Sequence, residues 1–330
     1  MNQYHHFFGV DISKKTVDIT FISEEENVHK QFTNNAEGMD LLLQWIEELS
    51  VDFTQTLFCM EATGLYCFTL THFLAEKSID VWIEHAAQIK KATALARGKN
   101  DKVDSQRIAL YATKNLDRLR LWKPMDKALE KIKHLATLRE RIVDTQKRLL
   151  VPIQEFEEVG NPEMAKLLTK SIKKSMDALE KDLTNIEKQI LDILAKDTDL
   201  NAKYHFAKSV VGIGFVSAIN LMIYTNGFTE MNNVRALACY CGVAPFGYDS
   251  GTSIKRKPKV HFMANKKLKC NLHMASLSAV KLDADLKQYY ERKVAEGKNK
   301  MSVLNAVRNK LLARVLSCVN NKRYYVNKVA

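Results

Sequence analysis

Four acidic side chains in three short motifs are the residues of this sequence best suited to hold a metal ion. Asp11 lies in FFGVDIS, Glu61 lies in CMEATG, and Asp101 and Asp104 lie in GKNDKVDS. Hard divalent cations such as Mg²⁺ need several oxygen ligands, which carboxylates supply. Reactions at phosphodiester bonds profit from one or two Mg²⁺ ions held in this way. The four acids therefore predict a Mg²⁺-dependent site that acts on phosphodiester bonds.

A second chemical motif is the segment GVAPFGYDSGTSIKRKPKV, which we expect to be irregular. Ser250 precedes a glycine there, and four cations follow: Lys255, Arg256, Lys257 and Lys259. A reachable hydroxyl beside clustered cations has what a phosphoryl-transfer nucleophile needs, because the cations stabilise charge on the phosphorus oxygens. Spacing alone favours a plain Ser-Gly turn. Ser253 is close enough to compete for the same role.

The four acids stand at the edges of predicted regular elements. FFGVD and TLFCME are typical of apolar strands that end on an acid, and Asp101 and Asp104 share one face of the helical stretch DKVDSQRIALYATK. Strands and helices alternate through residues 1–125, which predicts an α/β domain with ligands at the strand ends. Strand-end acids with a helix-borne pair are the geometry of RNase H-like nucleases. The predicted strands lie within 5–22 and at 56–60 and 79–84, and the helices at 38–50, 65–77, 86–96 and 102–115.

Residues 126–200 have a different pattern, with apolar side chains every three or four positions among Glu and Lys. This spacing predicts two long antiparallel helices, a helical hairpin or coiled coil, with the break at Pro152 and EEVGNPE. Such a hairpin serves dimerisation or spacing, or is a plain structural arm. The periodic positions include Leu129, Ile132, Leu135, Leu138 and Ile142, then Leu179, Leu183, Ile186, Ile190 and Leu194.

Residues 201–330 are predicted to be mainly helical and hold the whole excess of positive charge. They carry 22 Lys and Arg against 6 Asp and Glu, a net charge of +16 in a chain whose total is +12. Such asymmetry indicates a polyanion partner, because neutralising phosphates releases counterions; a merely soluble basic face is the alternative. The turn at Gly212 and Gly214, before a helix, is either a packing turn or a phosphate-binding one.

The remaining features place few further constraints on function. No apolar run approaches the roughly 20 residues of a membrane span, and the start MNQYHHFFGVD lacks a signal-peptide pattern. We therefore expect a cytoplasmic protein. The six cysteines form no CxxC pair, which predicts free thiols rather than a metal site.

The ordered motifs resemble those of the DEDD insertion-sequence transposases, whose kin include the Piv-type DNA invertases and which form an RNA-guided recombinase family. The resemblance covers nearly the whole chain. It is carried by FGVDISKKTVD, MEATGLY and ARGKNDKVDSQRIA, and then by VVGIGFVSAINLM, GFTEMNNVRALACYCGVAPFGYDSG and KKLKCNLHMA. Val211, Ala264-Asn265 and Leu268-Lys269 depart mildly from the family's pattern.

The resemblance implies a RuvC-like catalytic domain at 1–125, a helical connection at 126–200 and a transposase domain with a helix-hairpin-helix element at 201–330. It implies that Asp11, Glu61, Asp101 and Asp104 bind the metal and that Ser250 attacks DNA. It also implies a non-coding guide RNA that pairs with donor and target DNA, and an active dimer or tetramer. Lys255, Arg256 and Lys257 would steady the phosphate. Other expected nucleic-acid contacts are Lys259, Lys266, Lys267, Lys269, Gly212 and Gly214, with Asn100 and Lys102 beside the metal pair.

Three other functions fit parts of this pattern. A site-specific DNA invertase of the same family would share every motif. A metal-dependent junction nuclease would use water as the nucleophile and would not need Ser250. A nucleic-acid-binding module with a degenerate nuclease domain is disfavoured, because all four acids are present.

Overall fold

The computed structural model describes residues 3–92, 100–231, 233–250 and 254–327, and for 248–257 it describes the backbone alone. Ser253 and part of the predicted 86–96 helix therefore lie outside the described residues. The chain divides into two compact units, Met1–Pro124 and Met125–Ala330.

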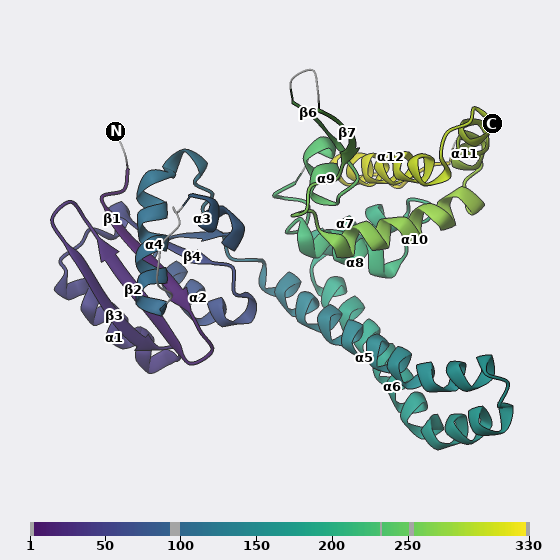
Figure 1. Ribbon diagram of the computed structural model, residues 1–330, viewed down its shortest axis with the longest axis horizontal. Helices are drawn as coiled ribbons and strands as arrows, with labels where there is room; N and C mark the ends of the chain where they lie inside the picture. Colours follow the sequence, from purple (N-terminus) through teal and green to yellow (C-terminus); the bar gives the residue numbers. More distant parts are fainter. Residues whose placement is uncertain (1–2, 93–99, 232, 251–253, 328–330) are drawn as a thin grey trace. The chain divides into compact units, whose positions relative to one another are not determined.

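The first unit is built on a five-stranded mixed sheet of order β3-β2-β1-β4-β5 (Figure 1). β1 pairs antiparallel with β2, which pairs antiparallel with β3, whereas β4 and β5 run parallel to β1. The strands are β1 (His6–Ile12), β2 (Thr16–Ile22), β3 (Asn27–Thr33), β4 (Thr56–Glu61) and β5 (Asp80–Glu84). The sequence predicted all of them except β3, whose side chains are mostly exposed.

Helices cover both faces of this sheet, and alternation along each strand decides which side chains meet them. Phe8 and Phe58 face a core shared with Leu42 and Leu70 from α1 and α2. Phe7 and Leu57 face the opposite side, where Ile108, Tyr111 and Ala112 of α4 pack. The helices are α1 (Ala36–Glu48), α2 (Phe68–Glu76), α3 (Ala86–Ala92) and α4 (Asp101–Lys114), with short 3₁₀ turns at Phe53–Gln55, Gly64–Cys67 and Leu116–Arg118.

The second unit begins with the predicted helical hairpin. α5 (Lys127–Glu158) and α6 (Pro162–Lys196) pack along each other, and Arg139 of α5 forms a 2.7 Å ion pair with Glu187 of α6. The predicted break at Pro152 is wrong, because α5 continues through this proline to Glu158. Pro152 is exposed, so the amide hydrogen bond that proline lacks is lost at a surface where water can satisfy the freed carbonyl. The turn occupies residues 159–161.

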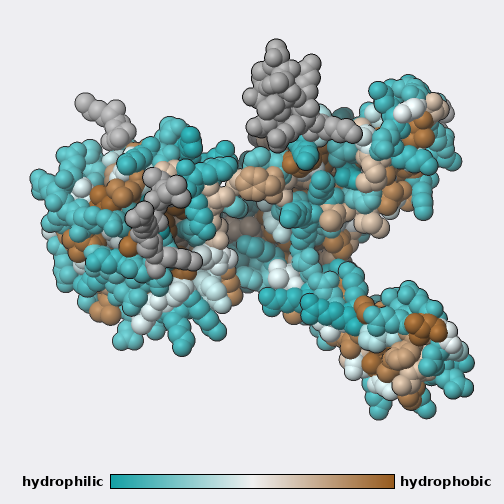
Figure 2. Space-filling view, in the orientation of Figure 1, coloured by the Kyte–Doolittle hydropathy of each residue, from teal (hydrophilic) through white to brown (hydrophobic). Residues whose placement is uncertain are grey.

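The end of this hairpin exposes apolar side chains that a solvated helical arm would not need. In the space-filling view the far end of α5 and α6, at the lower right, carries brown apolar surface among hydrophilic residues (Figure 2). The exposed side chains in this stretch include Val151, Val159, Met164 and Leu167. An apolar tip of this kind is typical of a contact surface.

The rest of the second unit is a helical bundle with one core. Its helices are α7 (Thr198–Lys208), α8 (Phe215–Tyr224), α9 (Val234–Tyr240), α10 (Lys266–Leu282), α11 (Ala284–Ala295) and α12 (Lys300–Asn320). α12 supplies Val307, Leu311, Leu312 and Val315, all fully buried, to a core that also contains Leu129 and Ile132 of α5. The base of the helical hairpin and the bundle therefore share a core.

The segment expected to be irregular is a β-hairpin instead. β6 (Phe246–Ser250) pairs antiparallel with β7 (Ile254–Lys259), with Tyr248 opposite Arg256 and Ser250 opposite Ile254. The glycines and charges obscured the strand signal, although Phe246, Tyr248 and Ile254 are residue types that favour strands. A register shift follows Phe246, on the side where Pro258 interrupts β7.

Two further expectations concern cysteines and membranes. All six cysteines are free; four are buried, Cys239 is partly buried and Cys270 is exposed. No helix in the described ranges is both long enough and apolar enough to cross a membrane.

Candidate catalytic site

Asp11 and Glu61 lie side by side at the carboxyl ends of two parallel strands. The register of β1 and β4 pairs Val10 with Met60, so the next residue on each strand is one of the two acids. Asp11 lies on the same face of the sheet as Phe7 and Gly9, because these residues are two positions apart along β1. Glu61 likewise shares the face of Leu57 and Cys59 on β4. Alternation therefore directs both carboxylates to the sheet face that α4 covers.

Asp101 and Asp104 lie in the first turn of α4. Asn100 caps this helix, with its Oδ1 accepting a 2.7 Å hydrogen bond from the Val103 amide. The predicted position of the acidic pair at a helix start is thus confirmed, and the cap explains why the helix begins there. Asp104 also forms a 2.7 Å ion pair with Arg107 one turn later.

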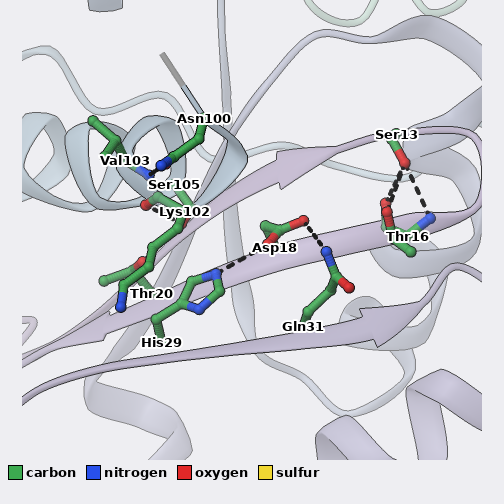
Figure 3. A network of polar contacts seen from close by, with 10 residues as sticks. All are labelled: Ser13, Thr16, Asp18, Thr20, His29, Gln31, Asn100, Lys102, Val103 and Ser105. Atoms are coloured by element: carbon green, nitrogen blue, oxygen red, sulfur yellow. Dashed lines mark hydrogen bonds and ion pairs between the residues drawn. The ribbon is translucent and has the colours of Figure 1, made fainter. Parts of the chain in front are cut away.

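Gly9 lets α4 approach the strand that carries Asp11. A Cβ added to Gly9 would stand 2.1 Å from the Ala109 amide nitrogen and 2.2 Å from the Ser105 carbonyl oxygen. Backbone therefore lies directly against backbone at this point, two residues before Asp11. Thr20 of β2 and Ser105 of α4 add a buried 2.7 Å hydroxyl–hydroxyl hydrogen bond across the same contact (Figure 3).

This packing brings the four predicted acids within electrostatic reach of each other. The pKa of Asp11 is raised from 3.8 to about 6, and burial is the largest cause. The remaining causes are nearby carboxylates, in decreasing order Asp101, Asp104, Glu61 and Asp18. Like charges held close together favour the protonated acid. Three motifs far apart in the sequence thus form one acidic cluster around Asp11.

The cluster has the donor chemistry of a Mg²⁺ site, since the four acids offer only carboxylate oxygens. A divalent cation would relieve the repulsion that raises the pKa of Asp11. In the described parts of the chain, however, no three Asp, Glu, His or Cys side chains converge closely enough to hold a metal ion. The charge and donor atoms of the cluster therefore fit the expected metal, whereas the spacing of the described side chains is wider than that of a metal site.

Asp18 is an acid of this cluster that the sequence reasoning missed. It lies opposite Asp11 in the β1–β2 ladder and is only 4% exposed. His29 Nε2 donates to its Oδ1 at 3.0 Å and Gln31 Nε2 donates to its Oδ2 at 2.9 Å, both from β3 (Figure 3). The two strands and tight turn predicted over 5–22 could have identified Asp18, because a tight turn between the strands places Asp11 and Asp18 opposite each other.

Ser250 occupies the last position of β6, immediately before the tip at 251–253, which lies outside the described residues. The predicted phosphate-contacting cations Lys255, Arg256 and Lys257 lie on the partner strand β7, and so does Lys259. The hairpin belongs to the second unit and the acids belong to the first. The role of Ser250 stays a prediction.

The other predicted nucleic-acid contacts lie on the helical bundle. At Gly212, φ is +94° and an added Cβ would stand 2.6 Å from the Ala275 carbonyl oxygen of α10, so close packing explains this glycine. Gly214 precedes α8 and has open space around it. Lys266, Lys267 and Lys269 lie in the first turn of α10, where Lys267 forms a 2.6 Å ion pair with Glu140 of α5.

Comparison with known proteins finds two family models that match separate parts of the chain. A family model described as "Transposase", of the DEDD insertion-sequence type, matches residues 8–156, and a second, described as "Transposase IS116/IS110/IS902 family", matches residues 204–291. The chain is 26% identical over 326 residues to the pilin gene-inverting proteins of Moraxella lacunata and Moraxella bovis, with 98% of each chain covered.

A more distant relative is an uncharacterized 43.6 kDa protein of insertion element IS110 from Streptomyces coelicolor, 22% identical over 165 residues. That match covers 49% of this chain and 39% of the relative. The first family match contains the acidic cluster, and the second contains Ser250. The chain belongs to the IS116/IS110/IS902 family of transposases and is an enzyme of DNA recombination.

Proposed function

We propose that this enzyme cuts and rejoins DNA with Ser250 as the nucleophile and with Asp11, Glu61, Asp101 and Asp104 as the ligands of Mg²⁺. The proposal assigns the first unit an RNase H-like, RuvC-like fold, with which its sheet order and strand-end acids are consistent. The observation that supports the metal role best is the raised pKa of Asp11, because burial and the three other predicted acids all contribute to it.

In the proposed reaction Ser250 loses its hydroxyl proton as Oγ forms a bond to phosphorus. The bond from phosphorus to the 3′ oxygen breaks, and that oxygen leaves as a protonated 3′-hydroxyl. Attack of another 3′-hydroxyl on the phosphoserine ester reverses the step and joins the strands in a new arrangement. A bound Mg²⁺ would activate the phosphate and offset its negative charge.

The proposed partners are donor and target DNA, a non-coding RNA of the element as guide, and further copies of the chain. The excess of +16 over residues 201–330 supports a nucleic-acid partner. The apolar tip of the α5–α6 hairpin supports assembly into a dimer or tetramer. Because the acids and Ser250 belong to different units, such an assembly could complete a site with the serine of one copy and the acids of another. The proposed DNA substrate agrees with the expected cytoplasmic location.

A site-specific invertase is the second candidate. It is favoured by the match to the two Moraxella proteins, which extends over 98% of each chain and whose names describe the inversion of a pilin gene. Sequencing the genomic flanks of many independent isolates distinguishes the two. Scattered insertion sites indicate transposition, whereas one segment found in two orientations indicates inversion.

Trapping of a covalent protein–DNA adduct tests the chemistry. The full-length protein is incubated with Mg²⁺, duplex DNA spanning both genomic flanks of its gene and RNA transcribed from those flanks, then run on a denaturing gel. We expect an adduct with the wild type, none with Ser250→Ala or Asp11→Asn, and an undiminished adduct with the control Ser175→Ala on the exposed side of α6. Metal-dependent cleavage without an adduct, unchanged in Ser250→Ala, would refute the serine mechanism and indicate a hydrolytic nuclease.

A further inference from the structure

A groove in the second unit lies at the root of the hairpin that carries Ser250. Its lining comes from α9, α12 and the segment that leads into β6, and its volume is about 790 Å³. Figure 1 labels these elements. Pro245, directly before β6, also lines the groove. The polar side chains on its walls come from both helices: Asn233 and Arg235 at the start of α9, and Ser302, Asn305 and Asn309 of α12.

The chemistry of this groove suits a nucleic-acid strand. Its described walls carry amides, a hydroxyl and a guanidinium but no Asp or Glu, and the remaining lining side chains are apolar. Arg and Asn side chains contact phosphate oxygens, and they also pair with base edges.

A buried positive charge lies behind one wall. Arg308 of α12 is 4% exposed and forms no ion pair with any carboxylate of the described residues. Its Nη2 donates to His273 Nδ1 at 2.7 Å, and its Nη1 donates to Asn305 Oδ1 at 3.5 Å. Its Nε has no hydrogen-bond partner. Since arginine keeps its charge, His273 must accept through Nδ1 and stay neutral.

Asn305 connects this charge to the groove. Its Oδ1 accepts from Arg308, its Nδ2 donates to the Val243 carbonyl oxygen at 2.7 Å, and the same side chain lines the groove. A buried charge without a counterion is costly. A phosphate in the groove would supply the missing negative charge while accepting a hydrogen bond from the second N–H of Asn305.

The position of the groove relative to Ser250 limits what it could contact. Ser250 comes five positions after Pro245 along extended chain, which is about 16 Å at 3.3 Å per residue. At about 3.4 Å per nucleotide of a B-form strand, this corresponds to roughly five nucleotides. A strand held in the groove would thus belong to the same DNA segment that the hairpin reaches.

We propose that this groove binds the backbone of the DNA strand a few nucleotides from the bond that Ser250 attacks. Arg235 and Asn309 contact the phosphates directly, and Arg308 contributes its charge through Asn305. This assignment depends on the proposed role of Ser250 for its substrate. The groove therefore acts as a grip that presents the phosphodiester to the hairpin.

DNA binding by the full-length chain in a Ser250→Ala background tests the groove without requiring catalysis. The probe is a fluorescein-labelled single-stranded DNA of mixed sequence, measured by fluorescence anisotropy from 50 to 200 mM NaCl, beside an RNA of the same sequence. Asn309→Asp is matched by Gln154→Glu on the exposed surface of α5, which makes the same change from amide to carboxylate. Arg235→Gln is matched by Lys174→Gln on the exposed surface of α6.

We expect Asn309→Asp to weaken DNA binding about tenfold, and Arg235→Gln to reduce the slope of log K against log salt by about 0.7, the value for one phosphate contact in a single strand. Both control variants should bind DNA as the parent does. Equal losses in groove and control variants would overturn the proposal, since net charge alone would then explain them. A loss confined to RNA would assign the groove to RNA and overturn it as well. Groove-dependent DNA binding together with a failed adduct experiment would refute the serine chemistry and leave a DNA-binding groove.

Discussion

Replacing Gly9 with alanine should move the helix that carries Asp101 and Asp104. The new Cβ would lie 2.1 Å from the Ala109 nitrogen and 2.2 Å from the Ser105 oxygen. Ordinary contacts of a Cβ begin near 3.4 Å, so α4 must retreat by more than 1 Å. Both clashing atoms belong to backbone, and no side-chain rotation can relieve them.

Two consequences follow from this displacement. Overpacking of this kind costs about 1 to 3 kcal/mol of unfolding free energy. A misplacement of about 1 Å among catalytic groups can cost on the order of 100-fold in rate. We therefore expect Gly9→Ala to lose about 2 kcal/mol in urea unfolding and to form adduct roughly 100-fold more slowly. The Thr20–Ser105 hydrogen bond would be strained by the same movement.

Gly297→Ala is the control for a general loss of stability. Gly297 lies between α11 and α12 at φ +80° with open space around it, so alanine there costs about 1 kcal/mol of backbone strain without touching α4. We expect that variant to keep full activity. If the unfolding free energy of Gly9→Ala lies within about 0.5 kcal/mol of the wild-type value and the two proteins are equally active, α4 does not rest on β1 as described.

Three further predictions concern the acidic cluster. The pKa of Asp11 is raised from 3.8 to about 6 in the folded chain, so the folded chain binds the Asp11 proton more tightly than the unfolded chain does. The stability gained from this proton is fully present below about pH 4 and is lost as the pH rises through about 6. Asp11→Asn should therefore stabilise the metal-free protein at pH 7 by roughly 2 kcal/mol, after allowance for partial exposure, and by less at pH 4; a destabilised variant at pH 7 would contradict this sign. Mg²⁺ should raise the melting temperature of the wild type and leave that of Asp11→Asn nearly unchanged, since only a chain with the full carboxylate set gains from binding; an equal rise in both would place the ion elsewhere. Asp18→Asn should lower the free energy of unfolding by about 1 to 3 kcal/mol, because an amide N–H would then face the N–H of His29 or Gln31. The same substitution should lower the pKa of Asp11 in an NMR titration, because it removes a neighbouring negative charge.

The acidic cluster could be predicted from sequence because each acid follows a strong local pattern. FFGVD and TLFCME are apolar strands, and the carboxyl ends of parallel neighbours meet at one edge of a sheet. Asn100 and the periodic residues after it predict a helix start at Asp101. How closely α4 approaches β1 was not predictable in this way. It depends on Gly9, whose lack of a side chain becomes informative only when a second backbone is known to lie against it.

The elements that were missed lack an apolar pattern. β3 has one buried residue, Phe32, among exposed neighbours, so only its pairing with β2 defines it as a strand. The β6–β7 hairpin likewise combines three strand-forming side chains with glycines and a run of cations. Its strands are defined by cross-strand backbone pairing, and such pairing leaves little trace in composition.

The same property of the hairpin bears on how the enzyme could work. A two-stranded ribbon is only marginally stable on its own, so the position of Ser250 depends on whatever fixes the root of the ribbon. The Asn305 hydrogen bond to the Val243 carbonyl oxygen and the Arg308 contact behind it provide such an anchor. The base of the hairpin is thus tied to α12, which lies in the core of the bundle. If Ser250 is the nucleophile as proposed, substitutions that loosen this anchor should slow adduct formation while the rest of the bundle stays folded.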